Sequence, residues 1–229
     1  VGVMWSISCI SSFLKNGHPF HLYDYVDISG IPEGTVIKDA SKILHPDRIF
    51  KYKDHDSYAG FSNLFRYKLL LEKGSYWVDT DVVCLKPLSH DAEYVFASER
   101  LQQPTPDKKV KVANCIMKAP SDSSILHYCY SEAANKDPEL LKWGQTGPLL
   151  LTEAIMKFDM WPYVAGPEVF CPVNWWEWDH FIDEASDNKL IDAQAVHLWN
   201  EMWRRNNTDK SASYYESSIY EQLKKEHLK

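Results

Sequence analysis

The chain has 229 residues, a formal net charge of -7 and an aromatic content of 14%, with nine Trp. This length is enough to bury the core of one α/β domain. The acidic balance argues against nucleic acid as a ligand, because a surface that follows a phosphate backbone needs a basic stripe. The apolar stretches are too short for a transmembrane helix, so we expect at most peripheral association with a membrane.

Short β-like runs alternate with helix-like segments along the chain. Strands are predicted at residues 2–5, 20–25, 76–79, 94–97, 115–118 and 195–199. Helices are predicted at 7–16, 60–73, 123–135 and 149–158, and another at the C-terminal end, within 213–229. Residues 101–112 are expected to form a mobile loop, and 162–179 an irregular aromatic segment. The alternation predicts an α/β fold, a mainly parallel sheet flanked by helices in a single domain over 1–210, with a helical appendage at 211–229.

The five Cys are spread along the chain and lack the C-x-x-C spacing of a zinc or redox motif. We therefore expect reduced, packed thiols and neither a disulfide framework nor a zinc site.

The most informative segment runs from Ser62 to Asp81. Its pattern is a leucine-rich helix, a stop at Gly74, a short aromatic strand, and then Asp79 and Asp81 at the strand end. Glycine suits the end of a helix because it adopts left-handed dihedrals at little cost. Ligand sites in open parallel sheets form beyond the carboxyl ends of strands, which places both carboxylates where a site is expected.

Two aspartates separated by one residue point to opposite faces of a regular strand, but a turn at the strand end lets both approach one ion. Carboxylate oxygens favour Mg²⁺ or Mn²⁺, which keep positions open for substrate phosphates. An acidic chain can therefore hold a phosphate ligand through a metal ion. The alternative for an isolated Asp-x-Asp is a turn with solvated acids.

Asn63 and Arg66 lie upstream, three residues apart, and so on one face of the predicted helix. Arg66 can reach a phosphate or a sugar hydroxyl from there. The alternative is that Arg66 pairs with an acidic side chain.

The combination of these features resembles the DXD-containing glycosyltransferases of the sugar-binding-region type, the family 32-like group that includes yeast mannosyltransferases, α1,4-galactosyltransferases and clostridial glucosylating toxins. The matching positions are Arg66, Tyr67, Leu69, Leu70, Leu71, Gly74, Tyr76, Asp79 and Asp81. The close match covers about 30 residues. The sequence departs from the pattern at Asn63, where an Asp is usual, at Ser75 in place of a second Gly, and at Met202 in place of Ser.

The resemblance implies a GT-A (Rossmann-like) fold and transfer of a sugar, with retention of configuration, from a nucleotide donor. By that analogy Asp79 and Asp81, with Thr80 between them, hold the metal and the diphosphate. Arg66 and Asn63 would bind the donor sugar. An amide at position 63 can still hydrogen-bond a hydroxyl, although it brings no charge.

The segment 195–204 is similar to the terminal His and Trp segment of the family. His197 is the expected third metal ligand, since a neutral imidazole suits Mn²⁺; a core or surface His in an aromatic cluster is the alternative. Trp203 is expected to close over the diphosphate with Asn200 nearby, although packing is an alternative for Trp199 and Trp203. Trp5 aligns with an aromatic position near the nucleotide base, where an indole can stack on the ring.

The segment 143–148 resembles a Thr-Gly-Pro element of the family. Gly147 permits close backbone approach, and Pro148 suits the first position of a helix. Gln145 or Thr146 would then face the donor sugar or the acceptor, and we predict that Gln145 is catalytic. The alternative is that the segment only begins a helix. Asn114 is a weaker polar candidate.

The predicted function is metal-dependent transfer of a hexose, from a UDP-sugar by preference or from GDP-mannose, to a glycan or a lipid-linked saccharide. The alternative is a lectin-like relative in which Trp175, Trp176 and Trp178 bind sugar rings; in the enzyme they would form an acceptor platform. A metal-dependent phosphohydrolase fits less well, because it gives no reason for the spacing of Arg66 and Asp79. A cytoplasmic bacterial enzyme of surface polysaccharide or lipopolysaccharide synthesis is the preferred context, with a Golgi lumenal domain or a secreted effector as alternatives.

Overall fold

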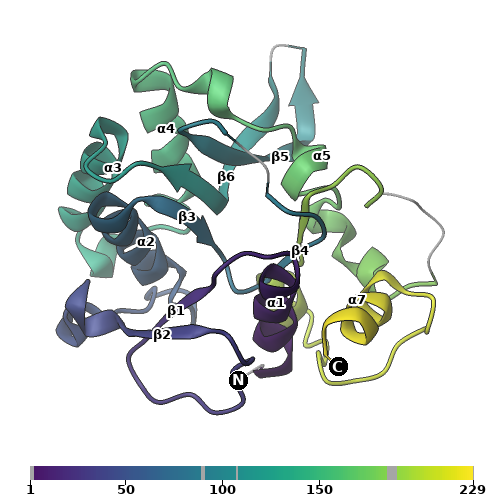
Figure 1. Cartoon of the computed structure of the whole chain (residues 1–229). Coiled ribbons are helices and arrows are strands. Elements are labelled where there is room, and N and C mark those ends of the chain that lie inside the picture. The colour runs from purple at the N-terminus through teal and green to yellow at the C-terminus, as the bar shows by residue number, and fades with distance from the viewer. Residues whose placement is uncertain (1–2, 89–90, 107, 185–189, 229) are drawn as a thin grey trace.

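The computed structural model describes residues 3–88, 91–106, 108–184 and 190–228; the side chains of residues 3–5 and of Lys108 lie outside this description. Helices alternate with strands, which confirms the predicted α/β class (Figure 1). The helices are α1 (Val3–Lys15), α2 (Ala59–Lys73), α3 (Ser124–Ala134), α4 (Pro148–Lys157), α5 (Pro167–Phe170), α6 (Asn200–Arg205) and α7 (Ile219–His227). The strands are β1 (His21–Asp24), β2 (Val36–Asp39), β3 (Ser75–Val78), β4 (Val82–Cys84), β5 (Val95–Thr105), β6 (Lys108–Ala119) and β7 (Ala195–His197).

Strand β6 is the centre of the main sheet. It pairs antiparallel with β3 on one side and with β5 on the other. A second pair, β4 with β7, is also antiparallel, whereas β1 and β2 form a parallel pair. The prediction of a mainly parallel sheet is therefore wrong for the described strands. The cause is the segment 101–112, expected as a loop, which instead belongs to the long β5–β6 hairpin and so reverses the chain direction.

The first element also differs from its prediction, because residues 3–5 begin helix α1 and are not a strand. Cys9, Ile10 and Phe13 are buried, a spacing that continues one helical face through the segment. The side chain of Trp5 lies outside the described residues, so its contact with a nucleotide base stays a prediction.

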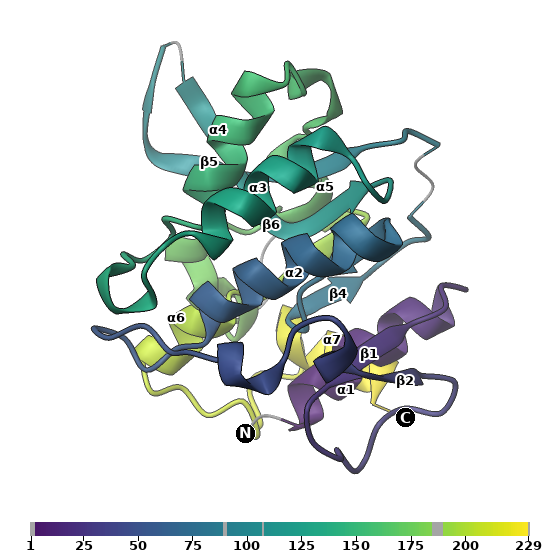
Figure 2. The same ribbon diagram turned by 90° about the vertical axis from the view of Figure 1, so that its left-hand side faces the viewer.

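Helices α2 and α3 run side by side along one face of the main sheet, and α4 packs on β6 (Figure 2). The core beneath them contains Leu70, Met117 and Leu126. A second core lies between α1, α5 and the sheet, and a third joins α1, β4, β7 and α7. The helix expected within 213–229 is α7, which packs against α1 and buries Tyr220 and Leu223. The boundary between 210 and 211 stays a prediction.

All five Cys are free and buried, as the sequence predicts. Within the described part of the chain, no helix combines the length and the apolar character needed to cross a bilayer.

The connection from α2 to β3 passes through two residues with positive φ. Gly74 ends α2 at φ 64° and ψ -159°, a region that is almost restricted to glycine. A Cβ at this position would stand 2.7 Å from the backbone nitrogen of Ser121. Ser75 follows at φ 75°, so this position, where the family pattern that the sequence resembles has a second Gly, also has a positive φ. The sharp turn directs β3 back under α2.

Replacing Gly74 by Ala is expected to lower the free energy of unfolding by about 2–4 kcal/mol, since it combines backbone strain with a clash against fixed backbone. Gly17 is the matched control, because it also has a positive φ, of 79°, but nothing within 4 Å of an added Cβ. Gly17→Ala should cost only about 1 kcal/mol. Urea denaturation of both variants measures the difference, and equal losses would contradict the role given to the Ser121 contact.

Candidate active site

The two aspartates of the Asp-x-Asp motif lie on one tight turn between β3 and β4. The amide of Asp79 donates to the carbonyl of Cys115 at 2.8 Å, which extends the β3–β6 pairing to the last position before the turn. The amide of Val82 then donates to the carbonyl of Asp79 at 3.1 Å and closes the turn. The reversal brings both carboxylates to one side, as the sequence predicts, where a continuing strand would separate them.

The register of β4 and β7 places His197 beside this turn. Val82 pairs with His197, and the amide of Leu198 donates to the carbonyl of Asp81 at 2.9 Å. The Nε2 atom of His197 lies 3.2 Å from Oδ2 of Asp81. Ligand atoms of Asp79, Asp81 and His197 all lie within 4.8 Å of one another. The structure therefore brings together the three residues predicted to bind a metal ion.

Arg66 connects helix α2 to the same turn. Its guanidinium lies 3.1 Å from Oδ1 of Asp79 and is only 5% exposed. The guanidinium also donates to the carbonyl of Asn114 and to both the carbonyl and the hydroxyl of Ser62. The indole of Trp77 stacks under the guanidinium and donates to Oδ1 of Asp79 at 2.7 Å. Arg66 thus holds the carboxylate of Asp79 in place. The sequence analysis gave pairing with an acidic side chain only as the alternative for Arg66.

The carboxylates and the imidazole have altered pKa values. Burial raises the pKa of Asp79, and the charge of Asp81 raises it further against the opposing effect of Arg66. Burial also acts to raise the pKa of Asp81, but the charge and hydrogen bond of His197 and the amide of Asn200, at 2.9 Å, bring it below its usual value. Burial acts to lower the pKa of His197, yet Asp81 raises it well above its usual value. The carboxylates and the imidazole therefore interact directly, and an ion bound to Nε2 of His197 would replace a proton there.

The donor set fits a divalent metal ion. Two carboxylates and one imidazole are a hard to borderline set, suited to Mn²⁺ and, through the oxygens, to Mg²⁺. Their spacing lets all three reach one ion. Arg66 holds Oδ1 of Asp79 and leaves the second oxygen of that carboxylate for the ion.

Asn63 lies one turn before Arg66 in a small buried cluster of polar side chains. Its Oδ1 accepts from Nδ2 of Asn114 at 2.9 Å, and its Nδ2 donates to the hydroxyl of Thr146 at 3.4 Å. Gly147 touches this cluster, because a Cβ there would lie 2.8 Å from Nδ2 of Asn63. The close backbone approach predicted at Gly147 is confirmed, as is Pro148 at the start of α4.

Gln145 points away from this cluster. Its Oε1 accepts from the backbone amide of Lys142 at 3.2 Å, which ties the side chain to its own turn. Gly144 and Pro148, on either side, line the cleft described below, whereas Gln145 is outside that lining among the described residues. A catalytic role for Gln145 stays a prediction, and the geometry offers it no direct support.

The prediction that Trp203 closes over a diphosphate is wrong. Its indole is fully buried and packs against Trp178 and Tyr220, with ring centroids 5.7 and 4.8 Å away. Its Nε1 donates to the carbonyl of Leu198 at 2.9 Å. Trp178 is consequently part of this core, so the acceptor platform predicted at Trp175, Trp176 and Trp178 loses its third member.

Trp199, and not Trp203 as predicted, lies beside the metal ligands. Its backbone is left-handed, with φ 56° and ψ 51°, and this turn sets its ring 4.1 Å from that of His197. A left-handed conformation costs a non-glycine residue about 1–3 kcal/mol and is common at functional sites. The Nε1 donates to the carbonyl of Val173 at 2.8 Å, which holds the ring in place.

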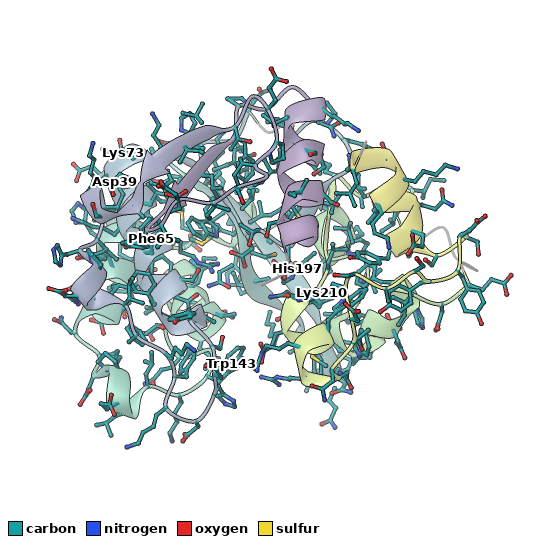
Figure 3. The ribbon with its side chains drawn as sticks, turned by 90° about the horizontal axis from the view of Figure 1, so that it is seen from below. Asp39, Phe65, Lys73, Trp143, His197 and Lys210 are labelled. Atoms are coloured by element: carbon teal, nitrogen blue, oxygen red, sulfur yellow. The ribbon has the colours of Figure 1, made fainter. Side chains whose placement is uncertain are left out.

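Lys210 lies next to the metal-ligand cluster, outside the cleft lining, and no sequence pattern predicted it there. It lies beside His197 in Figure 3, hydrogen-bonds the side chain of Asn200, and interacts with the charge of Asp81. Burial lowers its pKa. It comes from the segment after α6, where no motif or periodicity marks it, so its position follows only from tertiary packing.

The metal-ligand cluster opens into a cleft of about 2110 Å³. Asn63, Thr80 and Asn200 line it, as do aromatic residues from several segments: Tyr52, Trp143, Trp175 and Trp199. The guanidinium of Arg205 lies 5.1 Å from the ring of Trp143, so side chains from α6 and from the 138–147 segment meet there. Cavities of this kind, with polar groups at one end and aromatic walls, are typical of ligand sites.

Comparison with known families adds an independent observation. Residues 132–227 match the family model described as "Alpha 1,4-glycosyltransferase conserved region". This part of the chain is similar to that conserved region. The match includes His197 but lies outside the Asp-x-Asp segment, so the cleft is lined both by residues of the matched region and by residues that precede it.

Among solved structures, "PaToxG Glycosyltransferase" is similar at 14% sequence identity with a TM-score of 0.47. The similarity covers 71% of this chain and 65% of that one. No curated protein matches the sequence.

Trp203→Ala is expected to lower the free energy of unfolding by about 3–5 kcal/mol, because it leaves a large cavity in the third core. Trp161→Ala is the control: Trp161 is 39% exposed, and its loss should cost under about 1 kcal/mol. Denaturant unfolding measures both. A Trp203→Ala protein of unchanged stability would restore the ligand-contact assignment.

Proposed function

We propose that this chain is a metal-dependent retaining glycosyltransferase that takes a hexose from a nucleotide sugar, with UDP-sugars preferred over GDP-mannose. The observation that supports it most is the convergence of Asp79, Asp81 and His197 in a cleft wide enough for a nucleotide sugar and an acceptor. The alpha 1,4-glycosyltransferase region that supplies His197 supports the same chemistry.

Asp79, Asp81 and His197 would hold Mn²⁺ or Mg²⁺. A divalent ion held by these residues would supply electrostatic stabilisation of the leaving diphosphate. Lys210 supplies a positive charge from the protein itself, and Arg66 keeps Asp79 oriented through a contact that is shielded from water. The hydroxyl of Thr80 lies on the turn between the two carboxylates, at the cleft surface.

The donor sugar would lie against the buried polar cluster of Asn63, Asn114 and Thr146. Asn63 and Asn114 both line the cleft, and Gly147 packs against their side chains. Amides present both donors and acceptors, which suits sugar hydroxyls.

The acceptor would be a glycan or lipid-linked saccharide bound between Trp175 and the β5–β6 hairpin. Glu99 and Lys111 line this part of the cleft as an ion pair at 2.9 Å. Oε2 of Glu99 is buried without a hydrogen-bond partner among the described residues, so it is free to accept from a hydroxyl. Aromatic rings beside such groups are a common way to bind saccharides, since the ring covers the apolar face of the sugar.

In the proposed reaction the acceptor hydroxyl attacks the anomeric carbon from the face that the diphosphate leaves. A bond from the acceptor oxygen to the anomeric carbon forms as the bond from that carbon to the phosphate oxygen breaks. The hydroxyl proton passes to the departing diphosphate. No protein carboxylate is required as a covalent nucleophile.

Asp81→Asn should reduce slow hydrolysis of the preferred nucleotide sugar with Mn²⁺ at least about 100-fold, because it removes an ion ligand and the partner of His197. A panel of UDP-hexoses and GDP-mannose, assayed without acceptor, measures this. Asp47→Asn is the control, since Asp47 is 87% exposed and pairs with His45. Glycan binding by the native chain without turnover of any donor would instead favour a lectin-like protein.

Mn²⁺ affinity is expected to rise with pH, by up to about tenfold per unit while His197 is protonated. The reason is that Asp81 raises the pKa of His197 well above its usual value, so that the ion must displace a proton from the ring. Titration followed by Mn²⁺ electron paramagnetic resonance measures the slope. His197→Asn should flatten it, and the same slope in this variant would exclude His197 as the ligand.

A further inference from the structure

A second cluster of metal-binding side chains lies behind His197. Cys115 on β6, Cys171 at the end of α5 and His197 at the end of β7 have ligand atoms within 4.8 Å of one another. The two thiols are 2% and 0% exposed. No role in sugar transfer uses either sulfur atom.

The spacing of the sulfur atoms matches that of a metal site. The Sγ atoms of Cys115 and Cys171 stand 3.7 Å apart and are not bonded. Two sulfurs bound to one tetrahedral Zn²⁺, each at about 2.3 Å, would stand about 3.8 Å apart. The pair therefore needs little movement to hold a zinc-sized ion.

The imidazole of His197 supplies a third ligand from the correct side. Its Nε2 faces Asp81, while Nδ1 is buried and has no hydrogen-bond partner among the described residues. The thiol of Cys115 lies close enough to interact with the ring. Both Cys115 and His197 line the cleft, which gives an ion a route to the thiols.

We propose that Cys115, Cys171 and His197 form a second metal site, for a thiophilic divalent ion such as Zn²⁺. Binding replaces the two thiol protons and the Nδ1 proton of the imidazole, which all pass to solvent, with two metal–sulfur bonds and one metal–nitrogen bond. The two thiolates balance the charge of the divalent ion. Sulfur ligands select against Mn²⁺ and Mg²⁺, which favour oxygen.

The two metal sites compete for one side chain. A neutral imidazole has a single unprotonated nitrogen. With Nδ1 bound to the thiophilic ion, Nε2 carries the proton, donates to Asp81 and is unable to bind an ion at the Asp-x-Asp turn. This competition rests on the proposed function, whereas the thiol site itself does not. Zinc would thereby act as an inhibitor from behind the active site.

Titration with Cd²⁺ alone tests the site through the ultraviolet charge-transfer band of cadmium thiolates. The native chain should bind one equivalent with this band. Cys115→Ala and Cys171→Ala should lose it, and Cys129→Ala should keep it, since Cys129 is equally buried but lies in the core under α2 and α3. An absent band in the native chain, or an unchanged band in both site variants, would overturn the proposal.

A measurement on the native chain covers the case in which the variants do not fold. Cd²⁺ should protect Cys115 and Cys171 from alkylation under mild denaturation, with Cys129 unprotected, as mass spectrometry resolves. Equal protection of all five Cys, or of none, would contradict the site.

The competition is measured by Mn²⁺ electron paramagnetic resonance. One equivalent of Zn²⁺ should weaken Mn²⁺ binding at least about tenfold in the native chain and much less in Cys171→Ala. A cadmium–thiolate band without any Mn²⁺ binding would retain the thiol site and refute the proposed function. Mn²⁺ binding without the band would retain the function and refute the thiol site.

Discussion

The buried contact between Arg66 and Asp79 is the interaction on which the site depends. One guanidinium binds a carboxylate on the turn after β3, a carbonyl of β6 and a hydroxyl of its own helix, while its flat face covers Trp77. A buried charge that loses its partner is costly, by about 3–5 kcal/mol, so each of these elements is constrained by the others. Helix α2, strand β3 and strand β6 are thereby fixed in the one arrangement that presents Asp79 to the cleft.

Backbone hydrogen bonds position His197 beside Asp81. The β4–β7 pair sets His197 opposite Val82, and the left-handed turn at Trp199 returns the chain so that the amide of Asn200 reaches Asp81. Backbone pairing therefore positions His197. A side-chain contact, the salt bridge with Arg66, positions Asp79.

The sequence predicts the part of the site that is local. Helix, glycine stop, short strand and acidic turn follow each other within twenty residues, so periodicity and spacing suffice to place Asp79 and Asp81. Contacts between segments far apart in the chain could not be predicted from the sequence. The 101–112 segment is polar because the outer end of the hairpin is exposed, and only pairing with the partner strand makes it β. Trp203 and Trp199 have the same side chain four residues apart, and the difference between core and cleft lies in the turn at Trp199.

Lys210 and the Cys115–Cys171 pair are further residues that the sequence alone does not identify. Neither has a spacing that points to chemistry, since their neighbours in space come from segments far apart in the chain. The acidic composition argued only against nucleic acid, and it left open a phosphate ligand held through a metal ion. The charges near the Asp-x-Asp turn are consistent with such a ligand, because they include Lys210 and Arg66 and because the acids there are spaced to share an ion.

The register shift in the β5–β6 pairing has a consequence for how this chain can vary. Phe96 pairs with Met117, but the next residue, Ala97, pairs with Ala113, so Asn114 to Ile116 bulge from the ladder. That bulge turns one carbonyl toward Arg66 and another toward the amide of Asp79. Loss or gain of one residue within the bulge would move every side chain between the bulge and one end of the strand to the opposite face of the sheet. The exposed hairpin end has no such constraint. Length differences among homologues should therefore accumulate at the tip and be absent from the bulge.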